Sequence, residues 1–231
     1  AGAARRKSME GQGTLFDMFD NPTVPVESVV AVAEQSGFAT IATVEHSYTT
    51  VMSECELRKV VDICMGSTIL CFDIETSGLD IFTSRIVGIS LAIEPHKAWY
   101  IPFTIGSDRN ALESSYAEIL RPLFENTKIA KVGQNMKFDI LFLRTLGVEV
   151  RGEKWDTMLL HYLLDPESRH NMDALSERYL NYSPISIQTL IGKGREQMTM
   201  DMVGLQPISE YGCEDADITL QLYYALRPQI E

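Results

Sequence analysis

The sequence predicts an α/β fold in which helices flank a mixed β-sheet, and three observations carry this prediction. An apolar run at residues 69–76 is bounded by Ser67 and Gly78, as expected for a strand buried in a sheet. Two further apolar stretches within residues 85–103 lie on either side of a tight turn, which indicates a hairpin. The second half of the chain shows mostly helical periodicity, and this order of elements is typical of helices packed on the faces of a sheet.

Before the strand at residues 69–76, we expect a short strand at residues 46–52 and then a helix. Ser53 and Glu56 have the spacing of a capping box, which marks the start of the helix. Gly66 marks its end. The apolar face of this helix is formed by residues at helical spacing, namely Leu57, Val60, Val61 and Cys64.

After the strand at residues 69–76, the chain continues with the hairpin and then with helices. The hairpin strands are expected at residues 85–94 and 97–103. Gly147 has the position of a C′ residue that ends a helix. The remaining predicted elements are a strand at 128–132 and helices at 111–125, 135–146, 156–164, 172–180 and 208–226.

The length of 231 residues allows one good-sized domain and a tail. Residues 1–45 are expected to form a linker or tail that is partly flexible, and residues 46–231 the folded domain. The pattern of residues 28–44 is ambiguous. The chain is 45% hydrophobic and 23% charged, which is ordinary for a soluble globular protein. No apolar run approaches the roughly 20 residues that a membrane-spanning helix needs.

The net charge of −12 argues against a broad electrostatic grip on duplex nucleic acid. It leaves open a local site where bound metal ions reverse the sign of the charge. The four cysteines include no C-x-x-C pair, so a disulfide framework or a zinc site is not expected and a reducing cytosol fits the sequence.

Two carboxylates lie near the end of the predicted buried strand. Asp73 and Glu75 are two positions apart and therefore point to the same side, while Phe72 and Ile74 point into the packing. Neighbouring carboxylates repel each other and resist desolvation, so a divalent cation held by oxygen ligands would compensate them. The alternative is that both acids lie in solvent just past the strand.

The predicted helix at residues 135–146 carries an acid on its apolar side. Asp139 is followed at i+3 and i+4 by Phe142 and Leu143, which belong to the stripe that should face the core. A solvated acid would be expected on the opposite side. Burial of an unpaired carboxylate is unfavourable, so Asp139 is expected to have a partner.

The last predicted helix repeats this pattern. Tyr211 and Asp215 are separated by one turn, and Ile218 continues the same face. By the same angular count, Glu214 is expected to face solvent and Asp217 to face elsewhere. Asp215 is therefore the candidate ligand in this helix.

Asp73, Glu75, Asp139 and Asp215 together form a set of oxygen ligands without competing His or Cys. This composition favours Mg²⁺ or Mn²⁺ over zinc. The general chemistry of such a site is phosphodiester hydrolysis with two divalent metal ions, which clamp the attacking and leaving oxygens.

The stretches around these acids resemble the three motifs of the DnaQ-like (DEDD) exonuclease superfamily. They are residues 72–76, 133–139 and 211–217. Within the superfamily, the sequence is similar to the 3′→5′ proofreading exonuclease domain of bacterial DNA polymerase I (family A), from about His46 to the last residue. The resemblance implies an RNase H-like (DnaQ-like) fold. It extends to residues 87–92, 155–159 and 219–222.

The resemblance also implies roles for these residues. Asp73, Glu75 and Asp215 would hold one metal ion, and Asp73 would bridge to a second ion to which Asp139 contributes through water. Tyr211 would orient the attacking water together with Glu75. The sister subtype uses a His at this position, whereas the four His residues of this chain lie elsewhere in the sequence.

The resemblance also implies two residues that contact the substrate, one shortly after the first motif and one within the second. Leu79 would wedge against the terminal bases, and Asn135 would contact the terminal nucleotide. The implied substrate is a single-stranded or frayed 3′ end of DNA, from which mismatched nucleotides would leave as 5′-monophosphates. A mismatched end frays more readily than a paired one, which would give selectivity without base reading.

The implied partner is the rest of a polymerase chain, with its 5′-nuclease and polymerase domains, in the bacterial cytoplasm at the nucleoid and not at a membrane. Two alternatives remain. One is an RNA 3′-end exonuclease similar to ribonuclease D, and the other is a non-catalytic scaffold or clamp-docking module. Gln12, Leu15 and Phe16 resemble the short peptides that bind a sliding clamp, although a linker with a few apolar residues has the same pattern.

Overall fold

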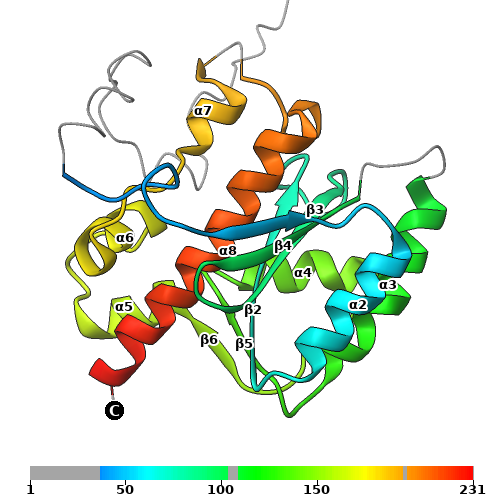
Figure 1. The fold of residues 1–231 in the computed structure, drawn as a ribbon, viewed down its shortest axis with the longest axis horizontal. Coiled ribbons are helices and arrows are strands. Elements are labelled where there is room, and N and C mark those ends of the chain that lie inside the picture. The colour runs from blue at the N-terminus through cyan, green and yellow to red at the C-terminus, as the bar shows by residue number, and fades with distance from the viewer. Residues whose placement is uncertain (1–36, 104–108, 195–196, 231) are drawn as a thin grey trace, which may run out of the picture.

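A computed structural model of the chain describes residues 37–103, 109–194 and 197–230. Its centre is a six-stranded mixed sheet in the order β1-β4-β3-β2-β5-β6 (Figure 1). β2 pairs with β3 and β3 with β4 in antiparallel register, and the other three neighbouring pairs are parallel. The strands are β1 (Ser47–Thr50), β2 (Ile69–Thr76), β3 (Ile86–Glu94), β4 (Lys97–Pro102), β5 (Ala130–Gly133) and β6 (Lys154–Asp156).

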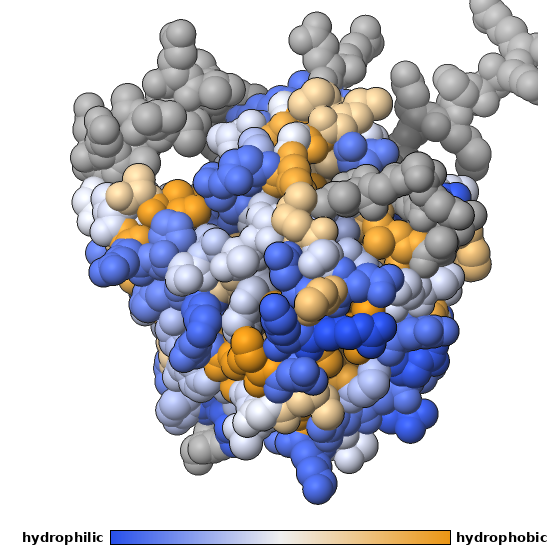
Figure 2. Space-filling model, turned by 45° about the vertical axis from the view of Figure 1, so that its right-hand side comes forward, coloured by the Kyte–Doolittle hydropathy of each residue, from blue (hydrophilic) through white to orange (hydrophobic). Residues whose placement is uncertain are grey.

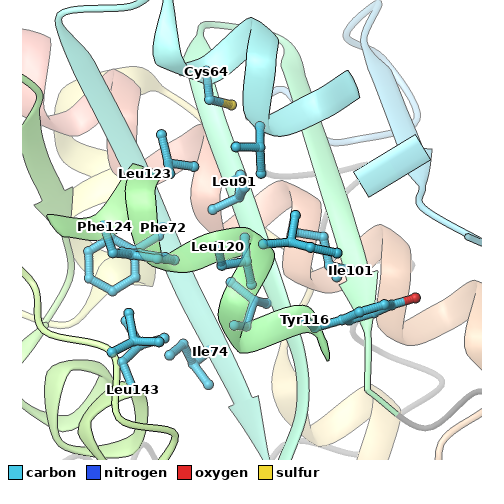
Figure 3. Close-up of a cluster of buried hydrophobic side chains, with 14 of the residues drawn as sticks. Cys64, Phe72, Ile74, Leu91, Ile101, Tyr116, Leu120, Leu123, Phe124 and Leu143 are labelled. Atoms are coloured by element: carbon cyan, nitrogen blue, oxygen red, sulfur yellow. The ribbon is translucent and has the colours of Figure 1, made fainter. Parts of the chain in front are cut away.

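One face of the sheet packs against α2 (Glu54–Met65), α3 (Arg109–Glu125) and α4 (Lys137–Thr145). Figure 3 shows this core, in which Phe72 and Ile74 of β2 lie beside Phe124 and Leu143 of the covering helices. The Phe72 and Phe124 rings meet edge to face with centroids 5.1 Å apart. The prediction that Phe72 and Ile74 point into the packing is therefore confirmed.

The opposite face is crossed by the long helix α8 (Leu205–Leu226), which contacts β1 to β5 (Figure 1). A second apolar core forms there from Cys71, Val132, Leu220 and neighbouring side chains. The helices α5 (Thr157–Leu164), α6 (Met172–Leu180) and α7 (Ile187–Ile191) pack around α8. Two short 3₁₀ turns, η3 (Met200–Met202) and η4 (Arg227–Gln229), precede and follow α8.

The predicted fold class and most predicted elements are confirmed, with differences at four elements. The strand β6 and the helix α7 were not predicted, because three and five residues are too short to show periodicity. Helix α4 begins at Lys137 instead of Asn135, because Asn135 has a left-handed backbone with φ 56°. Helix α8 begins three residues before the predicted start.

The helix boundaries at α2 and α4 follow the expected chemistry. The Ser53 side chain accepts a hydrogen bond from the Glu56 N–H. The Glu56 carboxylate in turn accepts a hydrogen bond from the N–H of Met52, one residue before the N–H that a capping box would use. Gly147 follows α4 with φ 71°, the left-handed conformation expected of a glycine at C′.

The surface in Figure 2 is mainly hydrophilic, with small, separate hydrophobic patches. In the part of the chain that the structure describes, none of the helices combines the length and apolar character that a membrane crossing requires. The suggested clamp-binding residues Gln12, Leu15 and Phe16 lie outside the described residues, and the expected domain boundary at residue 45 stays a prediction. Within the described part, Ala39 pairs with Tyr182 in an isolated bridge.

Candidate active site

Three of the four predicted metal ligands come together between β2 and α8. Asp73 and Glu75 point from β2 toward α8, on the side opposite Phe72 and Ile74. Asp215 projects from α8 toward them. One carboxylate oxygen from each of Asp73, Glu75 and Asp215 lies within 4.8 Å of the other two. The fold therefore brings these three acids, which lie far apart in the sequence, into one group.

The three acids share one poorly solvated space. Glu75 and Asp215 are buried and Asp73 is partly buried. Burial raises the pKa of Asp73 to about 6, against a hydrogen bond with Glu75 that acts in the other direction. Burial, followed by the charges of Asp73 and Glu75, raises the pKa of Asp215 well above its usual range. Ionised together without a cation, these carboxylates are strongly unfavourable.

This donor set fits a divalent cation. Oxygen ligands without His or Cys suit hard cations such as Mg²⁺ and Mn²⁺. The Oδ1 atom of Asp215 is buried and has no hydrogen-bond partner among the described residues. Because a buried acceptor without a partner is unfavourable, an ion at this position would satisfy both the orphaned oxygen and the clustered charge.

The fourth acid, Asp139, is buried on the first turn of α4 but does not belong to the group within 4.8 Å. Burial and then the charge of Asp73 raise the pKa of Asp139 well above its usual range, so the two acids are close enough to interact. This placement is compatible with a more distant contribution to the same site.

Asp156 positions the segment before Asp139, and sequence reasoning did not assign it a role. One of its carboxylate oxygens accepts a hydrogen bond from the N–H of Asn135 and the other from the N–H of Met136, both at 3.0 Å. The same side chain caps α5 by accepting from the N–H of Met158. A helix N-cap was predictable from the sequence around Asp156, but the bonds to the distant loop were not.

Tyr211 lies one turn before Asp215 on α8, and its side chain is 8% exposed. Burial, followed by the charges of Asp215 and Glu75, raises its pKa well above the usual value for a phenol. The hydroxyl therefore stays protonated at neutral pH. It can donate a hydrogen bond toward the carboxylate cluster.

The prediction that Glu214 faces solvent is wrong, because its side chain is fully buried. It accepts hydrogen bonds from the Tyr182 hydroxyl at 2.5 Å and from the Ile185 N–H at 2.7 Å. Burial raises the pKa of Glu214 to about 7, against the effect of the Tyr182 hydrogen bond. The prediction assumed that a residue about 100° around the helix from Asp215 would face solvent. It was wrong because α8 is covered by other elements on several sides.

Asp217 points away from Asp215, as predicted, and it is also buried. It accepts hydrogen bonds from the Tyr48 hydroxyl and the His96 N–H, each at 2.8 Å, and from the Gln221 side chain. Glu214 and Asp217 therefore attach surrounding segments to α8, and neither belongs to the group of Asp73, Glu75 and Asp215.

The two predicted substrate contacts lie on the loops that follow β2 and β5. Leu79 is 51% exposed on the loop after β2. That loop is closed by backbone and side-chain bonds between Ser77 and Arg85. The Oδ1 atom of Asn135 is buried and has no partner among the described residues.

Replacing Asp73 by asparagine is expected to stabilise the metal-free protein at pH 8. A carboxyl whose folded pKa is raised from 3.8 to about 6 favours folding when protonated, so its unfavourable contribution develops as pH rises through this window. Each pKa unit is worth about 1.4 kcal/mol. For a domain of this size, each kcal/mol of unfolding free energy shifts the melting temperature by about 2–4 °C. The melting temperature of the variant in chelator should therefore be several degrees higher than that of wild type.

Thermal melts of wild type and Asp73→Asn between pH 4 and 8 test this expectation. The difference between the two proteins should shrink toward pH 4, where both side chains are uncharged. Addition of Mn²⁺ at pH 8 should raise the melting temperature of wild type more than that of the variant. A variant that melts below wild type at pH 8 in chelator would show that the Asp73 carboxylate is compensated without an ion.

Comparison with known proteins gives relatives for most of the chain. Residues 48–231 match the sequence profile of a family described as 3′→5′ exonuclease. DNA polymerase I of Pseudomonas aeruginosa is 36% identical over 169 residues, which are 71% of this chain and 18% of that protein. DNA polymerase I of Rhizobium leguminosarum is 32% identical over 222 residues, which are 87% of this chain and 22% of that protein. The chain thus spans about a fifth of the length of these relatives.

Solved structures with the same fold share 15–16% sequence identity with this chain. Trypanosoma brucei RNase D aligns with a TM-score of 0.62 over 78% of this chain and 64% of its own. The POL domain of Pol1 from M. smegmatis in complex with DNA primer-template and dNTP aligns with a TM-score of 0.58 over 78% of this chain and 27% of its own. Brucella melitensis NrnC with bound Mg²⁺ aligns with a TM-score of 0.56 over 81% of this chain and 82% of its own. These likenesses show the fold, which is RNase H-like.

Proposed function

The chain belongs to the 3′→5′ exonuclease family of family A DNA polymerases, and we propose that it removes nucleotides from the 3′ end of DNA. The observation that carries the proposal is the buried group of Asp73, Glu75 and Asp215 within the region that matches the family. The products would be nucleoside 5′-monophosphates. The role in a cell would be proofreading in DNA replication and repair, on single-stranded or frayed ends.

The carboxylates would hold two divalent cations, Mg²⁺ or Mn²⁺. Asp73, Glu75 and Asp215 would hold one, and Asp73 and Asp139 would contribute to the other. When bound, such cations supply positive charge that activates a water nucleophile and stabilises the leaving 3′ oxygen. The protein contributes a fixed arrangement of ligands, because β2 and α8 are held together by a packed apolar core.

The remaining residues of the site would orient the reactants. The Tyr211 hydroxyl, protonated at neutral pH, would hold the attacking water together with the Glu75 carboxylate. Leu79 would pack against the terminal bases, because it is exposed on a loop whose ends are tied together. Among the described residues, the buried Oδ1 atom of Asn135 has no hydrogen-bond partner, and it would accept a hydrogen bond from the terminal nucleotide.

A time course on a 5′-labelled single-stranded DNA oligonucleotide tests the proposal. In Mg²⁺ or Mn²⁺, wild type should produce a ladder that shortens from the 3′ end. Chelator and the Asp215→Ala variant should both abolish the ladder, whereas the exposed-surface control Asp62→Ala should not. An intact oligonucleotide in both metals would contradict the proposal for this chain and favour the scaffold alternative.

The proposed partners are the other domains of a DNA polymerase I chain. The relatives are DNA polymerase I chains that are about five times longer than the matched segment. We infer that the polymerase and 5′-nuclease domains of such a chain would accompany this one in the bacterial cytoplasm, near the nucleoid. Matched DNA and RNA oligonucleotides separate the DNA function from an RNA 3′-end exonuclease, the alternative of the RNase D type. Faster trimming of RNA would favour that alternative.

Replacing Tyr211 by phenylalanine is expected to slow hydrolysis by about 10- to 100-fold and to leave metal binding intact. The phenyl ring keeps the packing on α8, but the hydroxyl that would orient the water is lost. Single-turnover rates on the labelled oligonucleotide measure the first effect, and Mn²⁺ calorimetry measures the second. A variant with a wild-type rate would remove Tyr211 from the proposed mechanism.

A further inference from the structure

Two hydroxyl side chains lie beside the carboxylate cluster, on the same face of the sheet. In the antiparallel register, Asp73 is opposite Ser90, and Glu75 is opposite Gly88. Ser90 is in turn opposite Tyr100 on β4. Because facing residues of neighbouring strands project to the same side, Ser90 and Tyr100 extend the polar surface from Asp73 and Glu75 across three strands.

The Tyr100 side chain takes the space that a side chain at position 88 would need. A Cβ atom on Gly88 would lie 2.1 Å from the Tyr100 hydroxyl oxygen. Since Gly88 faces Glu75, this places the hydroxyl next to Glu75. On the other side, a Cβ atom on Gly212 of α8 would lie 2.6 Å from Ser90 Oγ and 3.1 Å from the Tyr100 ring. Two glycines therefore make room for this ring and its hydroxyl.

The Tyr100 hydroxyl is buried and has no hydrogen-bond partner in the described part of the chain, and the same is true of Ser90 Oγ. Two other tyrosines next to α8 differ in this respect. Tyr48 donates to Asp217, and Tyr182 donates to Glu214. A buried hydroxyl without a partner destabilises the fold, so a phenylalanine at position 100 would be the better residue for packing alone.

Among the charged groups around Tyr100, Glu75 has the largest effect on its hydroxyl. Burial, then the charge of Glu75, raises the pKa of the Tyr100 hydroxyl far above its usual value, so this group is a permanent donor. Glu75 is one of the three acids that would hold the cation. A carboxylate that binds a metal ion through one oxygen is usually oriented by a hydrogen bond to its other oxygen. The Tyr100 hydroxyl is a donor at that place, held there by the packing of its ring between β3 and α8.

We propose that Tyr100 is a positioning residue for Glu75, whose hydroxyl donates a hydrogen bond to the Glu75 carboxylate when the site binds a divalent cation. This inference rests on the proposed function. It differs from the assigned role of Tyr211, because Tyr100 acts on a ligand and not on the substrate or water. The unpartnered hydroxyl in the metal-free protein is then explained by its use in the metal-bound state.

The variants Tyr100→Phe and Tyr48→Phe form a matched pair, since each loses one buried or half-buried hydroxyl beside α8. Tyr100→Phe should bind Mn²⁺ about tenfold more weakly in calorimetry and lower kcat on a single-stranded oligonucleotide by about tenfold, the lower limit for partners of metal ligands. Its KM should stay within about twofold and its melting temperature in chelator should not fall, because no contact to substrate and no existing hydrogen bond is lost. Tyr48→Phe should lower the melting temperature and keep wild-type Mn²⁺ affinity and kcat.

The two proposals fail in different ways. Wild type that does not shorten DNA would overturn the proposed function, while the Mn²⁺ affinities of wild type and Tyr100→Phe would still decide the inference. An active wild type with equal Mn²⁺ affinity and equal kcat in Tyr100→Phe would overturn the inference alone. A Tyr100→Phe variant that melts below wild type in chelator, with unchanged Mn²⁺ affinity, would show a purely structural role for the hydroxyl.

Discussion

Replacing Asp73 by alanine is expected to lower the rate of 3′-end hydrolysis by about a thousandfold or more, while the protein stays folded. Asp73 is the acid through which the two proposed cations would be joined, and such ions stabilise the transition state by several kcal/mol. A loss of about 4 kcal/mol corresponds to a factor of about a thousand in rate. Folding should survive, because the carboxyl group that is removed is unfavourable when ionised in this site, where burial raises its pKa to about 6.

Single-turnover hydrolysis of a labelled oligonucleotide at saturating Mg²⁺ measures this loss. Circular dichroism and a thermal melt in chelator show whether the variant is folded. Asp62→Ala, on the exposed side of α2, serves as the matched control for removal of an aspartate. An Asp73→Ala protein that is folded and retains a rate within tenfold of wild type would exclude Asp73 as a bridging ligand.

The acids that form the site could be predicted because each breaks a local pattern. Asp73 and Glu75 interrupt a buried strand, and Asp215 lies on the apolar side of a helix. Such violations of the hydrophobic pattern are visible in a single sequence and point to function. Glu214 shows the limit of the method, because a helix covered on several sides has no solvent face for angular counting to find.

The residues that support the acids were harder to predict, because their roles depend on contacts between distant segments. Asp156 holds the loop at Asn135 and Met136 across about 20 positions of sequence. The proposed role of Tyr100 beside Glu75 depends on the register of three strands. Nothing in the local sequence fixes that register, since it follows from strand pairing and from the two glycines that admit the ring. Residues that position the acids of a site are therefore harder to identify from the sequence than the acids themselves.

The largest loss of stability is expected from Phe72→Ala, because Phe72 joins β2, which carries Asp73 and Glu75, to the helical layer on one face of the sheet. Its side chain is fully buried, directly before Asp73, and it packs against Phe124 (Figure 3). Truncation of a buried phenylalanine lowers the free energy of unfolding by about 3–5 kcal/mol. This is a large part of the roughly 5–15 kcal/mol by which a typical domain is stable.

Urea denaturation of the purified chain measures the effect, and Phe82→Ala provides a control that removes the same atoms. Phe82 is 90% exposed on the loop after β2, so its truncation should change stability by no more than about 0.5 kcal/mol. Equal losses in the two variants would mean that Phe72 does not anchor β2 in the core. A selective loss in Phe72→Ala would tie the position of Asp73 and Glu75 to the packing on the opposite side of the sheet. Successive side chains of β2 point to opposite faces of the sheet, so one set would anchor the strand in the core while the other forms the candidate site.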